Sequence, residues 1–131
     1  MTSFRFYPEE RLKGKRLIKR LFEEGSSKGM YPLRFVWLHT AERRGTAPVR
    51  VAFGVSRRNF KLAVQRNKIK RRMREAWRLH KHELYEKLNA MDGQMALMII
   101  YTGNEEKGFA EIEKSVKRAI RKLPELWLAN S

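Results

Sequence analysis

The segment from residue 57 to residue 81 limits the possible folds most strongly, because it combines eleven basic residues, one acidic residue and a helical apolar pattern. Its apolar residues recur at the spacing of one face of an α-helix. The same apolar face extends over residues 62–88, and its residues are Leu62, Ile69, Met73, Ala76, Trp77 and Leu84. The spacing predicts one long helix over residues 62–88, capped near Asn59, with its apolar face in the core.

The bases of this helix lie on another face, four residues apart, and they are Arg66, Lys70, Arg74 and Arg78. Like charges at this spacing cost about 0.2–0.5 kcal/mol per pair in an isolated helix. Residues 57–81 carry a net charge of +10, which is most of the +16 of the whole chain. A phosphate backbone would offset this repulsion, so the pattern favours nucleic acid as the partner. The alternatives are a solvated basic face and nonspecific binding.

The 131 residues fit one domain over 1–131, and the 42% of hydrophobic residues suffice for a core. The longest apolar run, residues 95–101, is seven residues long. A membrane span needs about 20, so we expect no membrane partner. The chain has no cysteine, which excludes disulfides and thiolate metal sites. The first residues lack the apolar core of a signal peptide, so we expect a cytoplasmic protein.

The N-terminal half of the chain predicts one helix and two strands. Residues 14–24 are expected to form a helix with an apolar stripe. Gly25 would end this helix in the left-handed conformation, and residues 26–29 would form the loop that follows. Residues 33–39 are rich in strand formers, and residues 49–57 alternate between apolar and polar or small residues. The short connection between the two strands favours an antiparallel pair.

The C-terminal part predicts a strand over residues 94–101 that is covered on both faces, because the run is almost continuously apolar. A last helix then begins at an Asn104 cap and ends at Pro124. Together with the first half, this gives an α+β fold in which helices pack on a small sheet.

No group of residues resembles an active site. The histidines are His39, His80 and His82, and the last two, two residues apart on a helix, point to different sides. No phosphate loop, dinucleotide turn or nucleophile elbow is present. We therefore expect no catalytic residue and no metal site in this chain.

The basic helix resembles the bacterial ribonuclease P protein family, whose signature stands here as residues 66–74. Two upstream segments strengthen the resemblance: residues 11–25, similar to the family's N-terminal helix, and residues 54–58, similar to its strand that ends in Val-Ser and two bases. The resemblance covers residues 11–123. It implies an α-β sandwich of αβββαβα order, with a left-handed crossover between parallel strands.

The resemblance also implies a function. The chain would be the accessory protein subunit of an endoribonuclease whose large RNA subunit, with bound Mg²⁺, hydrolyses the 5′ leader from precursor tRNA. By position, the residues facing the RNA subunit would be Arg66, Asn67, Lys68, Lys70, Arg71 and Arg74. Those of a cleft for the single-stranded leader would be Phe22, Ile18, Ser56 and Arg58. The motif's second arginine is replaced by Lys68, and Ile18 stands where the family often has an aromatic residue.

The leader residues also have simpler interpretations. Phe22 lies on the apolar stripe of the first helix, so it is either core or partly exposed in the cleft. Ala52, Gly54 and Ser56 form a small-residue face, which suits either nucleotides or a closely packed helix. The alternatives for the whole chain are a ribosomal or generic single-stranded RNA-binding protein, and a free-standing nuclease, which the lack of a catalytic group disfavours. We expect no DNA partner.

Overall fold

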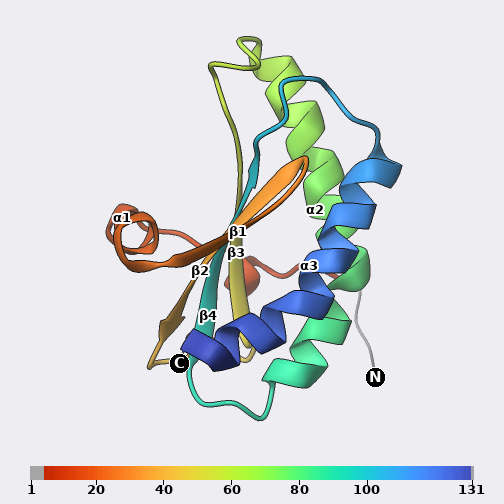
Figure 1. Cartoon of the computed structure of the whole chain (residues 1–131). Coiled ribbons are helices and arrows are strands. Elements are labelled where there is room, and N and C mark those ends of the chain that lie inside the picture. Colours follow the sequence, from red (N-terminus) through yellow and green to blue (C-terminus); the bar gives the residue numbers. More distant parts are fainter. Residues whose placement is uncertain (1–4, 131) are drawn as a thin grey trace.

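The fold is built on a four-stranded sheet in the order β1-β2-β4-β3. The computed structural model describes residues 5–130, the last three by their backbone alone. The strands are β1 (Ser26–Met30), β2 (Leu33–Thr40), β3 (Val49–Val55) and β4 (Gln94–Tyr101) (Figure 1). Strand β2 runs antiparallel to β1 and to β4, whereas β3 and β4 are parallel. A parallel pair needs a crossover, and the long helix α2 (Ala63–Leu88) supplies it.

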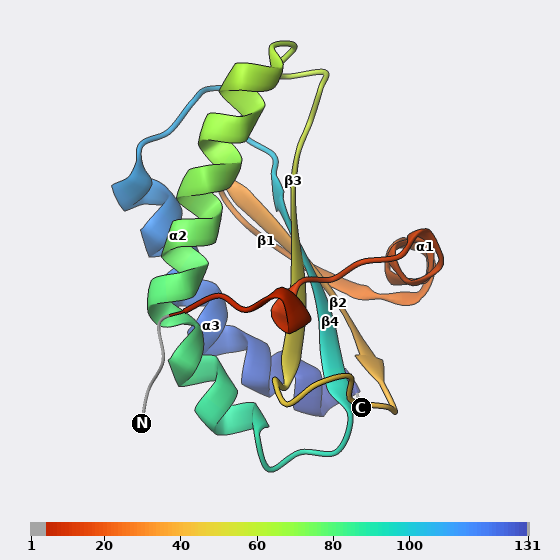
Figure 2. The ribbon, with the colours of Figure 1, turned by 180° about the vertical axis from the view of Figure 1, so that it is seen from behind.

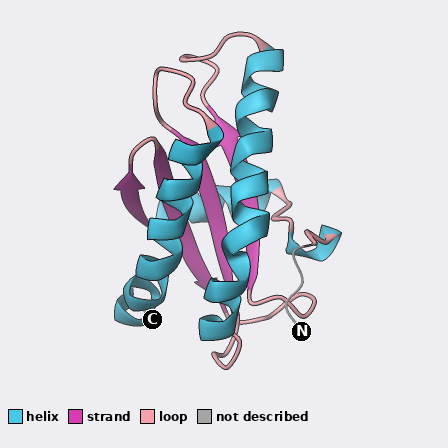
Figure 3. Ribbon diagram, turned by 90° about the vertical axis from the view of Figure 1, so that its right-hand side faces the viewer, coloured by secondary structure: helices cyan, strands magenta, loops and turns pink. Residues whose placement is uncertain are grey.

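The helices lie on both faces of the sheet. Helices α2 and α3 (Phe109–Asn130) cover one face side by side, as Figure 3 shows. Helix α1 (Lys15–Glu24) lies on the opposite face, and a short 3-10 turn, η1 (Pro8–Glu10), precedes it (Figure 2). This arrangement confirms the expected α+β sandwich of αβββαβα order.

Each face of the sheet has its own hydrophobic cluster. The larger one joins the sheet to α2 and α3 and includes Phe35, Trp77, Leu97 and Ile120, all with at most 1% of their surface exposed. The smaller one lies under α1 and centres on Leu12, Leu21, Val36 and Ala96. Strand β4 contributes to both clusters, which explains its nearly continuous apolar sequence.

Two predictions about the strands are wrong. Strands β2 and β3 do not pair, because β4 lies between them and the connection over residues 41–48 passes its end. Residues 26–29 are not a loop but most of β1, which pairs with β2 along its whole length. Gly25 has an extended backbone with φ of −74°, not a left-handed one. Glycine is needed there for space, since a Cβ atom would approach Trp37 O to 2.8 Å and Leu21 O more closely.

The predicted helix ends also need correction. Leu62 is 70% exposed rather than part of the core, and Asn59 donates from Nδ2 to Gly103 O instead of capping α2. Helix α3 begins at Phe109, five residues after the predicted cap. It continues through Pro124 to Asn130 because Trp127, in its last turns, is buried at 1% exposure and anchors the end of the helix.

Candidate nucleic-acid interface

The basic face of α2 is held outward by the packing of the opposite face. Ile69, Met73, Ala76 and Trp77 have no exposed surface, and they lie against the sheet and α3. A helix fixed along one side presents its other side at fixed angles, since residues three or four apart share a face. The bases of α2 therefore stand on a rigid support.

Three bases in the middle of this face are open to a ligand. Lys70, Arg71 and Arg74 form no salt bridge with any described residue. Arg71 and Arg74 are exposed and Lys70 is half-buried. Asn67, one turn earlier, is exposed too. These four predicted residues form one surface, which we call the open face of α2.

Three bases beside the open face are engaged within the molecule. Arg66 Nη1 donates to Phe60 O at 2.9 Å and to Lys61 O at 2.8 Å, so it secures the turn that leads into the helix. Lys68 and Arg72 lie 3.8 Å and 3.7 Å from the Glu106 carboxylate. The predicted Arg66–Arg78 row therefore has an open middle, while Arg66 takes part in local structure.

Arg78 and Glu75 form an ion pair at the far end of the row. Arg78 Nη2 lies 2.5 Å from Glu75 Oε1. The hydrogen bond from Arg78 holds the pKa of the Glu75 carboxyl below its ordinary value, and the same bond raises the pKa of Arg78. Part of the positive charge of Arg78 is thus compensated inside the helix.

The second predicted surface lies between α1 and the sheet. Four half-buried side chains pack against the hydrophobic cluster under α1, and they are Ile18, Ala52, Met98 and Ile100. Phe22, one turn after Ile18 on α1, is 53% exposed and is therefore not a core residue. A side chain at Gly54 would approach Met98 Cε to 2.9 Å, so the surface here is low and closely packed. We call these residues the Phe22 surface.

Ser56 and Arg58 lie just beyond β3, at the end of the sheet where α2 begins (Figure 2). Ser56 Oγ accepts a hydrogen bond from Arg58 N at 3.1 Å, which fixes the turn. Ser56 is half-buried and the Arg58 side chain is exposed. The turn thus joins the strand carrying Gly54 to the helix carrying the open face.

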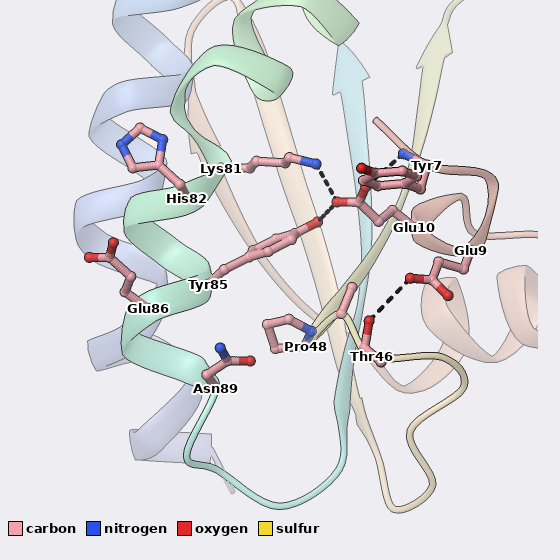
Figure 4. A pocket seen from close by; sticks show the side chains of 11 residues that line it. Tyr7, Glu9, Glu10, Thr46, Pro48, Lys81, His82, Tyr85, Glu86 and Asn89 are labelled. Carbon is pink, nitrogen blue, oxygen red and sulfur yellow. Dashed lines mark hydrogen bonds and ion pairs between the residues drawn. The ribbon is translucent and has the colours of Figure 1, made fainter. Parts of the chain in front are cut away.

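The burial of one charged side chain could not be predicted from the sequence. Lys81, counted above among the bases of the segment, is 3% exposed, and its Nζ lies 2.5 Å from Glu10 Oε1 (Figure 4). Tyr85 donates to the same oxygen at 2.6 Å. Burial and the Glu10 carboxylate raise the pKa of Tyr85 well above its ordinary value. This network fastens η1 to α2 and belongs to the core.

Two of the three histidines make structural contacts. His80 Nε2 lies 2.8 Å from Glu113 Oε2, and His39 Nε2 lies 2.9 Å from Asp92 O. Within residues 5–130, no three His, Asp or Glu side chains lie together as a metal ion requires. No described helix is long and apolar enough to cross a membrane.

Comparison with known proteins agrees with this picture. Residues 6–124 match the family described as Ribonuclease P. The ribonuclease P protein component of Porphyromonas gingivalis is 30% identical over 119 residues, which cover 91% of this chain and 86% of the relative. That of Chlorobium phaeobacteroides is 36% identical over 111 residues, covering 79% and 75%.

Solved structures share the fold. The RNase P protein of Staphylococcus aureus, at 2.0 Å, superposes with a TM-score of 0.69 at 21% identity, covering 87% of this chain and 94% of the other. The RNase P protein of Thermotoga maritima gives a TM-score of 0.65 at 21% identity, covering 86% and 96%.

The fold and the charge define a small, strongly basic α-β sandwich protein. The family match spans most of the chain, and the relatives carry the name of the same family. The chain therefore belongs to the ribonuclease P protein family, and the resemblance seen in its basic helix is confirmed.

Proposed function

We propose that this subunit of ribonuclease P binds the RNA subunit of the enzyme through the open face of α2 and binds the 5′ leader of precursor tRNA on the Phe22 surface. The observation that carries the proposal is the group formed by Lys70, Arg71 and Arg74. These cations share one rigid face and have no salt-bridge partner among the described residues. A phosphate backbone is the ligand that such a face suits best.

The side chains on the open face have distinct roles in this proposal. Each guanidinium of Arg71 and Arg74 can donate two parallel hydrogen bonds to phosphate oxygens. Lys70 adds a point charge, and the Asn67 amide can both donate to and accept from sugar or base. Arg66 and Lys68 lie beside this face, with Arg66 acting mainly by holding the start of α2.

The Phe22 surface is suited to a single strand. Phe22 offers an exposed ring on which a base can stack, and stacking is tolerant of sequence. Gly54 and Ser56 are small and half-buried, so they add little side-chain bulk to this end of β3. Arg58, at the end of β3, supplies a charge for a phosphate. The protein would thus hold the leader in extended form while the RNA subunit holds the tRNA.

Catalysis belongs to the RNA subunit in this proposal. The described residues offer no cluster that could hold Mg²⁺, so the ion would be bound mainly by RNA and would activate the water that hydrolyses the leader. The contribution of this chain is binding and orientation. The cytoplasmic location expected from the sequence is part of the same proposal.

The test is reconstitution with the ribonuclease P RNA of the same organism. Nuclease-treated protein, RNA subunit and both together are incubated with precursor tRNA and Mg²⁺. We expect no cleavage by the protein alone, and tighter binding of precursor tRNA than of mature tRNA when both are present. Cleavage by the protein alone would contradict the proposal. So would equal affinity for the RNA subunit and for an unrelated RNA of equal length, which is the behaviour of a generic RNA-binding protein.

A further inference from the structure

A hollow lies on the α1 side of the sheet, and it is separate from the Phe22 surface. Its volume is about 770 Å³, and it is bounded by the N-terminal part of α1, the ends of β2 and β4, and the connection after β2. Leu17 and Ala96 form its apolar floor. None of the leader or RNA-subunit residues predicted from the sequence lines it.

The walls of this hollow are strongly basic. Five cationic side chains from three separate segments converge on it, and they are Lys13, Arg16, Arg20, Arg44 and Arg50. Among the described residues that line it, Glu42 alone carries a carboxylate. Arg20 is engaged with Glu24 at 3.0 Å, but the other four cations form no salt bridge with a described residue. The hollow therefore holds an excess of uncompensated positive charge.

Arg50 is the one half-buried cation among these five. Its Nη2 donates to Arg11 O at 3.1 Å, while its Nε is buried and has no hydrogen-bond partner within the described structure. Burial, and then the charge of Arg44, lower the pKa of the Arg50 guanidinium. A buried donor without a partner is unfavourable, and oxygen atoms of an anion would satisfy it.

The start of α1 adds to the same field. Gly14 is the N-cap of this ten-residue helix, with φ of 105°, and no side chain caps the free N–H groups. The first turn contains no acidic residue, although acidic residues are the ones the helix dipole favours there. Gly14 and Arg16 both line the hollow. The start of the helix and the cations thus border the same space, which suits a phosphate group.

We propose that this hollow is a second RNA site, which binds phosphate groups of an RNA strand. The inference rests on the proposed function in one respect, which is the identity of the RNA that supplies the phosphates. The distal leader and the RNA subunit carry the same phosphate groups. The position favours a strand that continues from the Phe22 surface. Arg50 and Gly54 point to the same face of β3, and four residues of a strand span about 13 Å. The strand would cross α1 or the residues that lead into it.

The test compares two pairs of exposed arginines. Arg16→Gln with Arg44→Gln removes two charges from the hollow, and Arg118→Gln with Arg121→Gln removes two from the exposed face of α3. The probe for the free protein is a single-stranded RNA oligonucleotide, titrated at several salt concentrations. Two lost phosphate contacts should lower the slope of log affinity against log salt by about 1.4. The α3 pair should lower it much less.

The holoenzyme then identifies the source of the phosphates. The same variants are assembled with the RNA subunit and given precursor tRNAs with a short or a long leader. If the salt slope falls only for binding of the protein to the RNA subunit, the hollow binds the RNA subunit. If it falls only for binding of the precursor tRNA with the long leader, the hollow binds the distal leader. Unchanged slopes in all arms, or equal changes in the α3 pair, would overturn the inference. If the wild-type protein failed to assemble with the RNA subunit, the proposed function would be contradicted. The oligonucleotide titration would still test whether the hollow binds RNA.

Discussion

Lys81 Nζ lies 2.5 Å from Glu10 Oε1, although the two residues are 71 positions apart in the chain. Both side chains are almost fully buried, at 3% and 2% exposure. The second oxygen of Glu10 accepts from Tyr7 N at 2.7 Å, so the carboxylate is bound on both sides. This pair fixes the N-terminal segment to α2 and thereby sets where the chain crosses β3 to reach α1.

Removing one partner of this pair should destabilise the fold. Lys81→Met leaves the Glu10 carboxylate buried without its cation, which typically costs about 3–5 kcal/mol. Adding Glu10→Gln removes the remaining charge, so the double variant should be more stable than Lys81→Met alone. Urea denaturation measures both, with exposed Lys87→Met as the control, for which we expect a change of about 0.5 kcal/mol or less. Additive effects of the two changes would show that the residues are not coupled.

Tyr85 should make the protein sensitive to alkali. Its pKa is raised in the folded protein by burial and by Glu10, while the unfolded chain releases the proton at about pH 10. Above that pH the unfolded state binds fewer protons, so stability falls as pH rises, by up to about 1.4 kcal/mol per unit. Tyr85→Phe should lose less stability than the wild type between about pH 10 and 11.5, measured by urea denaturation. Parallel pH dependences would contradict the assignment.

Substitutions at Phe22 and at its neighbour Leu21 should affect different properties, namely RNA binding and stability of the fold. Phe22 is 53% exposed and Leu21 has no exposed surface. Loss of one stacked base costs about 1–3 kcal/mol, so Phe22→Ala should weaken binding of precursor tRNA to the holoenzyme by about 5- to 150-fold. Binding of mature tRNA and the melting temperature should stay unchanged. Leu21→Ala should instead destabilise the fold by about 2–5 kcal/mol.

The result that would remove Phe22 from the leader surface is specific. If Phe22→Ala weakens precursor and mature tRNA equally and lowers the melting temperature as Leu21→Ala does, the ring supports the fold rather than the leader. Ser56→Trp provides a second test. It should weaken binding of precursor tRNA alone, because a large side chain would fill the small-residue face at the end of β3.

The sequence predicted the elements whose signals are local. The apolar spacing of Ile69, Met73 and Trp77 predicted α2, and the apolar run over residues 94–101 predicted β4 as a strand covered on both faces. Strand β1 was missed because its first four residues, 26–29, are polar or small and become a strand only by pairing with β2. The pairing of β3 was missed because nothing local shows that β4 inserts beside it.

The site could be predicted in part for the same reason. The positions of the bases on α2 follow from helical spacing, as does the pairing of Arg78 with Glu75 three residues before it. The engagement of Lys68 and Arg72 depends on Glu106, which spacing along the helix does not identify. The burial of Lys81 depends on Glu10, far away in the chain. The basic hollow joins α1, β3 and the connection after β2, so no continuous motif contains it. Long-range contacts, rather than composition, decide which charges are open.

The central claim is that the open face of α2 binds the RNA subunit through phosphates. The most direct measurement is the salt dependence of holoenzyme assembly for the wild type and for Lys70→Ala, Arg71→Ala and Arg74→Ala combined. Arg66 is left intact because it supports the start of the helix. Each lost phosphate contact lowers the slope of log affinity against log salt by about 0.7–0.9, so the account predicts a decrease of about 2.1–2.7 with an unchanged melting temperature. An unchanged slope would show that this face is only solvated and would contradict the account.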